Sequence, residues 1–146
     1  MKLSDAGKKL IKDFEGLRLK AYQCSAGVWT IGYGHTGAVN EGEEVTQFYA
    51  DTFFDFDVLR FEDAVNDALM GGQTPPLQQH QFDALVSLAY NIGVAAFKGS
   101  TLVKRAKVNP NDPLIGGEFM KWCNANGKYN EGLHKRRAAE AKFYFK

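Results

Sequence analysis

Helical patterns on both sides of a short glycine-rich stretch limit the folds open to this chain. Residues 17–36 (LRLKAYQCSAGVWTIGYGHT) are β-branched and aromatic, and Gly27, Gly32 and Gly34 interrupt them. This composition predicts two or three short antiparallel strands joined by tight turns. Apolar residues before the stretch recur at helical spacing after Ser4, a typical helix N-cap. We therefore expect an α+β protein whose sheet is confined to the first third.

The rest of the sequence predicts helices. Thr46 precedes a helical pattern that extends to about Met70 and ends at Gly71-Gly72. Pro75-Pro76 opens another helix, shorter helices follow, and the last one runs to Phe145. A length of 146 residues is enough for one domain with its own core.

Composition excludes several classes of protein. With 45% hydrophobic and 24% charged residues, the chain is neither disordered nor fibrous. A net charge of +1 gives no overall basic field for nucleic acid. We find no apolar run of the ~20 residues that a membrane span needs, and the N-terminus lacks the apolar stretch of a signal peptide. Cys24 and Cys123 are expected to be reduced thiols, with a single bridge as the alternative.

Glu15 is a candidate general acid because it ends the first predicted helix, just before Gly16. A carboxyl at this end of a helix faces the negative end of the helix dipole, which disfavours its ionised form. Neighbouring Phe14 and Leu17 favour partial burial, which acts in the same direction. General acid catalysis needs a carboxyl that stays protonated near neutral pH. The alternative is a solvated glutamate at a frayed helix end.

The run EGLRLKAYQCSAGVWTIGYGHT at 15–36 resembles the phage-type lysozymes, the endolysins of glycoside hydrolase family 24. Their pattern is Glu, eight residues, Asp, five residues, Thr, and then Ile-Gly-x-Gly-His. The residues that match it are Glu15, Thr30, Ile31, Gly32, Gly34 and His35. The resemblance continues in QFDALVSLAYNIGVAAFKGSTL (81–102), at Phe119 and Trp122, and in GLHKRRAAE (132–140). It departs at one position, where Cys24 replaces the usual Asp.

This resemblance implies hydrolysis of the β-1,4 bond between N-acetylmuramic acid and N-acetylglucosamine in bacterial peptidoglycan. Glu15 would protonate the leaving oxygen, and Cys24 and Thr30 would hold or activate the attacking water. Because a neutral thiol replaces a carboxylate poorly, Cys24 would be a thiolate, a water-positioning group or a covalent nucleophile. Neither Asp13 nor Asp51 stands where the missing carboxylate should be.

The resemblance also implies supporting residues. His35 would be structural and hydrogen-bonded to an acidic partner, while Phe97 and Ser100 would lie near the sugar subsites. Weaker candidates for amide hydrogen bonds or sugar stacking are Asn124, Asn126, Tyr33, Trp29 and Trp122. We expect no metal and no cofactor, since the His and Cys residues lack metal-ligand spacing.

Arg137 is singled out by its position on the last predicted helix. It shares one helical face with Leu133, Ala141 and Phe145, so the face is expected to pack inward. A buried arginine needs an anionic partner. The resemblance implies that this partner is Glu15, with Arg136 as the alternative arginine; an arginine reaching out from the edge of the face is the other interpretation.

The fold implied is mainly helical and lysozyme-like. We predict a single catalytic domain at 1–146, with an N-terminal lobe at about 14–45 that contains the sheet. A linking helix follows at about 46–70, and a helical C-terminal lobe spans about 71–146. The helix at 1–15 is expected to pack on that C-terminal lobe.

Two other functions remain open at this stage. A lysozyme-like protein could bind peptidoglycan without cleaving it, or act as a lytic transglycosylase, which needs an acid but no water-activating group. A disulfide between Cys24 and Cys123 that blocks the site is a third hypothesis.

The expected partner is bacterial peptidoglycan, and no nucleic acid partner is expected. An anionic membrane surface is a second possible contact of the basic last helix, through Lys135, Arg136, Arg137, Lys142 and Lys146. A packed terminal helix with a solvated basic side is the alternative. We expect a monomer that is made in the host cytoplasm without a signal peptide and acts on the periplasmic cell wall after release.

Overall fold

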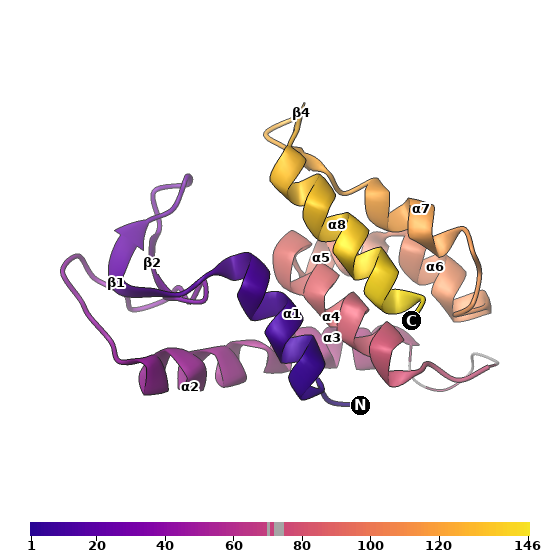
Figure 1. Cartoon of the computed structure of the whole chain (residues 1–146), viewed down its shortest axis with the longest axis horizontal. Coiled ribbons are helices and arrows are strands. Elements are labelled where there is room, and N and C mark those ends of the chain that lie inside the picture. Colours follow the sequence, from indigo (N-terminus) through magenta and orange to yellow (C-terminus); the bar gives the residue numbers. More distant parts are fainter. Residues whose placement is uncertain (70, 72–74) are drawn as a thin grey trace. The chain divides into compact units, whose positions relative to one another are not determined.

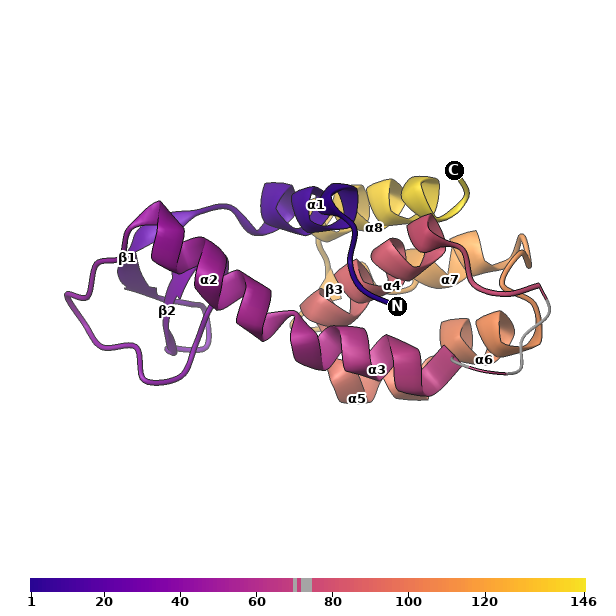
Figure 2. The same cartoon turned by 90° about the horizontal axis from the view of Figure 1, so that it is seen from below.

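The computed structural model describes residues 1–69, 71 and 75–146 of the chain. These residues form two compact units, which Figure 1 and Figure 2 show from two sides. Unit 1 consists of Met1–Lys8 and Arg60–Lys146, and unit 2 consists of Lys9–Leu59. Helix α1 (Asp5–Glu15) begins in unit 1 and ends in unit 2. The three residues that the sequence predicts to be catalytic therefore all belong to unit 2.

Unit 2 is built on an antiparallel hairpin, as the pattern at 17–36 predicts. Strand β1 (Arg18–Gln23) pairs with β2 (Trp29–Gly32), with Tyr22 opposite Thr30. Helix α2 (Gln47–Asp57) packs on β2, and the Thr46 side chain caps its first turn.

A second tight turn follows β2. Gly32 has a φ of +67°, which side-chain-bearing residues rarely adopt. The chain folds back there, and Ile31 and His35 exchange two backbone hydrogen bonds of 2.8 and 2.9 Å. The Ile-Gly-Tyr-Gly-His motif is thus a closed turn that places His35 at a defined position.

Unit 1 is largely helical. Its helices are α3 (Leu59–Leu69), α4 (Gln79–Ile92), α5 (Val94–Gly99), α6 (Thr101–Val108), α7 (Ile115–Met120) and α8 (Glu131–Tyr144). Every residue of α4 from Gln81 to Ala89 is buried. Helix α8 packs against both α4 and α7 (Figure 1). The core of this unit therefore lies around α4.

A short second hairpin lies in unit 1, so the prediction that strands are confined to the first third is wrong. Strands β3 (Asn124–Ala125) and β4 (Lys128–Tyr129) pair antiparallel. Asn126 and Gly127 between them have φ values of 51° and 74°. An Asn-Gly pair with two positive φ values is the preferred two-residue hairpin turn. This dipeptide was the signal that the sequence analysis missed.

The continuous helix predicted from 46 to about 70 is two helices, α2 and α3, separated at Val58. Val58 keeps helical backbone angles (φ −68°, ψ −22°), and no glycine or proline marks the interruption. The chain passes from unit 2 to unit 1 after Leu59, so the two helices bury side chains in different units. Met70 and Gly72, at the predicted helix end, lie outside the described residues.

Two further boundaries differ from the prediction. The helix expected to open at Pro75-Pro76 begins at Gln79, because Gln78 and Gln81 form a capping box there. The bounds of the two units also differ from those of the predicted lobes. The helix at 1–15, which was expected to pack on the C-terminal lobe, is divided between the units after Lys8. The assignment of one catalytic domain stays a prediction.

The α+β, mainly helical architecture is confirmed. None of the helices in the described part of the chain is both long and apolar enough to cross a membrane.

Candidate active site

Cys24 and Thr30 meet at the hairpin turn between β1 and β2. The turn is closed by backbone hydrogen bonds from Cys24 N to Val28 O (3.0 Å) and from Gly27 N to Cys24 O (2.8 Å). Thr30 is buried on β2, its hydroxyl donates to Val28 O (2.9 Å), and this hydroxyl is one of the groups that act on the Cys24 thiol. The predicted juxtaposition of this thiol and this hydroxyl is present in the structure.

The turn stabilises the ionised form of the thiol. Backbone N–H groups of Val28 and Ala26 hold the pKa of Cys24 below its ordinary value, and the Thr30 hydroxyl acts in the same direction. Partial burial opposes these hydrogen bonds without reversing their effect. Backbone donors gathered around a half-buried sulfur favour a thiolate, the reactive form of cysteine.

Glu15 is the last residue of α1 and is half-buried. Gly16 follows with a φ of +72° and ends the helix by donating its N–H to Lys12 O (2.9 Å). Lys12, within the last turn of the helix, forms an ion pair with Asp51 of α2 (2.9 Å). This ion pair fixes the end of α1 that carries Glu15.

The two aspartates considered as replacements for the missing carboxylate, Asp13 and Asp51, are engaged in ion pairs. Asp13 pairs with Lys9 at 2.7 Å, and Asp51 pairs with Lys12. Neither carboxylate is therefore a free substitute for the one that Cys24 replaces. Within the described ranges, no three His, Cys, Asp or Glu side chains gather closely enough to hold a metal ion.

His35 has the acidic partner that the sequence analysis expected without placing it. Its Nδ1 lies 2.7 Å from Asp57 Oδ2, at the end of α2. The imidazole also stacks on Phe53, with ring centroids 4.4 Å apart. His35 thus ties the turn after β2 to α2, which fits a structural role.

Arg137 lies completely buried between α8 and α4. Its Nε is 2.8 Å from Glu140 Oε2, and its Nη2 donates to Asn91 Oδ1 at 2.9 Å. Glu140 also pairs with Arg136 (3.1 Å). The expected anionic partner is thus present within α8 itself, and the pairing of Arg137 with Glu15 stays a prediction.

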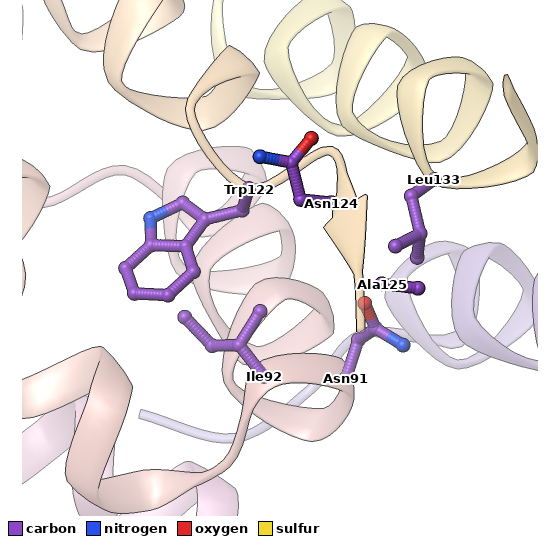
Figure 3. Close-up of a pocket in the computed structure, with 6 residues that line it drawn as sticks. All are labelled: Asn91, Ile92, Trp122, Asn124, Ala125 and Leu133. Carbon is purple, nitrogen blue, oxygen red and sulfur yellow. The ribbon is translucent and has the colours of Figure 1, made fainter. Parts of the chain in front are cut away.

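A pocket of about 420 Å³ opens in unit 1 close to this cluster. Its lining is shown in Figure 3: Asn91, Ile92, Trp122, Asn124, Ala125 and Leu133. Trp122 and Asn124 are among the residues that the sequence analysis proposed for substrate contacts. An indole and two side-chain amides around one cavity suit a ligand with both apolar and amide groups.

Comparison with known proteins decides the family. A family model described as phage lysozyme matches residues 12–140, which is most of the chain. The chain belongs to the phage lysozyme family.

Three relatives of this phage lysozyme are similar over more than nine tenths of their own length. The endolysin of Acyrthosiphon pisum secondary endosymbiont phage 1 is 49% identical over 145 residues, covering 96% of this chain and 95% of that one. The muramidase domain of SpmX from Asticaccaulis excentricus superimposes with a TM-score of 0.89 and 40% identity, covering 99% and 98% of the two chains. The endolysin of Escherichia coli O157:H7 phage FAHEc1 superimposes with a TM-score of 0.88 and 39% identity, covering 99% of this chain and 93% of that one. The protein is accordingly a lysozyme-type glycoside hydrolase.

Phe97 and Ser100, which were expected near the sugar subsites, are both buried in this lysozyme. Phe97 has no exposed surface. Ser100 is the N-cap of α6, where its hydroxyl donates to Phe97 O (2.7 Å) and accepts from Val103 N (3.2 Å). Both residues pack inside unit 1, and a role near the sugar subsites stays a prediction.

The basic face predicted for the last helix is smaller than the sequence indicated. Arg136 and Arg137 are buried and paired with Glu140, because α8 packs against α4 and α7. The cations that remain exposed are Lys135, Lys142 and Lys146.

The polar residues that sequence reasoning missed include Asp57, Asn91 and Glu140. Glu140 had a signal, since it follows Arg136 and Arg137 by four and three residues, the spacings at which helical side chains meet. Asp57 and Asn91 had none, because their partners lie 22 and 46 residues away. Cys24 and Cys123 are both free thiols, so the disulfide hypothesis has no support in the structure.

Proposed function

We infer that the protein is an endolysin that degrades bacterial peptidoglycan, by hydrolysing the β-1,4 bond between N-acetylmuramic acid and N-acetylglucosamine. The observation that carries this inference is the turn of unit 2, where a thiol whose ionised form is favoured and the buried Thr30 hydroxyl follow Glu15 in sequence, within the segment that the family model matches. The cell wall is then the place of action.

The proposed reaction assigns each residue one task. Glu15 donates its proton to the glycosidic oxygen while the bond to the anomeric carbon breaks. A water molecule attacks that carbon and transfers a proton to the Cys24 sulfur. Thr30 orients the water or the thiolate through its hydroxyl.

The deciding experiment compares the wild-type protein with Glu15→Gln on purified Gram-negative peptidoglycan. We expect the wild type to release reducing sugar ends. Glu15→Gln should release them at a rate lower by on the order of 100-fold or more, because its side chain has no acidic proton to donate. Asp13→Asn is the matched control, since Asp13 lies on the same helix in an exposed ion pair and should keep full activity. Thermal melting checks that all three proteins are folded.

The other outcomes identify the rival functions. Anhydromuramic ends in place of reducing ends would establish a lytic transglycosylase. Peptidoglycan binding without any release would establish a binding protein, with Cys24 as the reason for the lost activity.

A second measurement separates the two active roles open to Cys24. A thiolate that deprotonates water gives a product of inverted anomeric configuration, whereas a covalent nucleophile gives retention. Inversion is the expected result because the hydroxyl of Thr30 beside the sulfur can hold a water molecule. Retention, with a glycosyl adduct on Cys24 in mass spectrometry, would assign the nucleophilic role instead.

Contact with an anionic membrane surface is a weaker proposal for the last helix. It rests on Lys142 and Lys146 beside Phe143 and Phe145, since the two arginines are buried. Cosedimentation with anionic vesicles tests it, and Lys142→Gln/Lys146→Gln should abolish any binding. We also propose a monomer without nucleic acid partners, which sedimentation analysis with and without DNA checks.

A further inference from the structure

A buried cluster of charged side chains in unit 1 has no part in the proposed bond cleavage. Glu140, Arg136 and Arg137 of α8 are all at most 4% exposed. Glu140 Oε1 accepts hydrogen bonds from Ser87 Oγ (2.6 Å), Arg136 Nε (3.1 Å) and Arg137 Nη2 (3.2 Å). One carboxylate thus holds two guanidinium groups in the core of the unit.

Stability by itself is a poor reason for such a cluster. Removing charges from water is costly, and a buried ion pair often contributes no more than apolar side chains of the same volume. The cluster is also incompletely satisfied: within the described residues, Arg137 Nη1 has no hydrogen-bond partner, whereas Arg137 Nε and Glu140 Oε2 face each other as an ion pair at 2.8 Å. What the cluster does provide is a guanidinium group of Arg137 fixed in one orientation.

Arg137 contacts the pocket through Asn91, one of the residues that line it. Arg137 Nη2 donates to Asn91 Oδ1 at 2.9 Å, and Asn91 lines the pocket with Trp122 and Asn124 (Figure 3). A guanidinium group has only donors, so the Asn91 amide must turn its oxygen toward Arg137. The two N–H donors of Asn91 Nδ2 do not take part in this bond, so they are available to a ligand at the rim of the pocket.

We propose that Glu140 is a positioning residue that, through Arg137, sets the Asn91 amide so that the pocket binds an amide carbonyl oxygen of the substrate. The proposal rests on the proposed function, since peptidoglycan supplies such oxygens in its N-acetyl groups and in its peptides. Without Glu140, the Arg137 side chain has no fixed position and the Asn91 amide is free to rotate.

The first test changes the amide without disturbing the core. Asn91→Asp keeps the acceptor for Arg137 and removes the two donors. We expect KM for soluble peptidoglycan fragments to rise about threefold to tenfold, the effect of one lost hydrogen bond, with kcat changed less than about twofold. Asn109→Asp is the control, since Asn109 Oδ1 also accepts a hydrogen bond (from Asn111 N, 2.9 Å) but lies outside the pocket. An unchanged KM for Asn91→Asp in an active enzyme would overturn the proposal and leave the proposed function intact.

The second test asks whether Glu140 acts on substrate binding through Asn91. Glu140→Gln should raise KM as Asn91→Asp does, and Glu140→Asp, which keeps the charge, should restore part of the affinity. In a protein that already carries Asn91→Asp, Glu140→Gln should raise KM no further, because both changes remove the same interaction. Additive effects on KM would overturn the proposal. If Glu140→Gln does not fold, the Asn91→Asp measurement still decides.

The source of the carbonyl oxygen follows from the substrate used. A KM effect that persists on glycan strands stripped of peptide assigns the N-acetyl group, and an effect seen only with peptide-bearing strands assigns the peptide. Both results uphold the proposal. If the wild-type protein has no activity on either substrate, the proposed function itself is wrong. The Glu15 experiment detects that outcome separately.

Discussion

The hairpin turn of unit 2 and the buried cluster of unit 1 hold polar groups in opposite ways. The turn surrounds the half-buried Cys24 sulfur with backbone N–H groups from the same few residues. The cluster is completely buried and uses side chains from helices distant in sequence, such as Ser87 and Glu140. The two free thiols reflect the contrast: hydrogen bonds lower the pKa of Cys24, whereas burial raises that of Cys123. Local backbone donors thus stabilise charge near the surface, and a buried charge needs charged partners.

Breaking the cluster should have the largest effect. Glu140→Leu leaves Arg136 and Arg137 buried without a counter-charge, so we expect the free energy of unfolding to fall by about 3–5 kcal/mol. Urea denaturation measures this. Lys135→Gln, at an exposed pair on the same helix, should cost about 0.5 kcal/mol or less. Equal losses in the two variants would mean that the cluster is no different from a surface ion pair.

Replacing the thiol should be next in size. Cys24→Ser keeps the shape of the side chain but loses the thiol whose ionised form the turn favours, so kcat should fall on the order of 100-fold. Cys24→Asp restores a charge and should stay within about tenfold of the wild type. Initial rates on peptidoglycan measure both, with Cys123→Ala as the control. A fully active Cys24→Ser would show that ionisation of the thiol is not needed.

The pair of His35 and Asp57 should have a smaller effect, on stability. Asp57→Asn removes a 2.7 Å contact to a carboxylate and should lower the free energy of unfolding by about 1.5–3 kcal/mol. The folded fraction should keep its kcat, because this pair supports a turn. Thermal unfolding and rates measured on one preparation test both statements. A lower kcat at unchanged stability would place His35 in the reaction instead.

The smallest effect concerns the pH at which Cys24 reacts. Hydrogen bonds favour its thiolate, so its alkylation by iodoacetamide should reach half-maximal rate at a lower pH than for an ordinary thiol. Thr30→Val removes the hydroxyl that helps to lower the pKa of Cys24, so the pKa rises and alkylation at pH 7 slows. Thr52→Val is the matched control, since its hydroxyl also donates to a backbone carbonyl at 2.9 Å. An unmoved midpoint in Thr30→Val would mean that the backbone N–H groups suffice.

Much of unit 2 could be predicted because its contacts are local. The strand pattern, the positive-φ glycines and the thiol beside Thr30 all depend on residues close in sequence. The interruption at Val58 could not be predicted, since its backbone stays helical and the passage between units causes it.

The sequence by itself determined the α+β class, the hairpin, the helix cap at Thr46 and the spacing of Glu15, Cys24 and Thr30. These features follow from local backbone preferences and from apolar periodicity. Tertiary structure alone decided that Arg136 and Arg137 are buried rather than exposed, that Asp57 holds His35, and that Asn91 lines the pocket. The reason is that charge and burial depend on which helices meet, and the helices that meet here are far apart in the sequence.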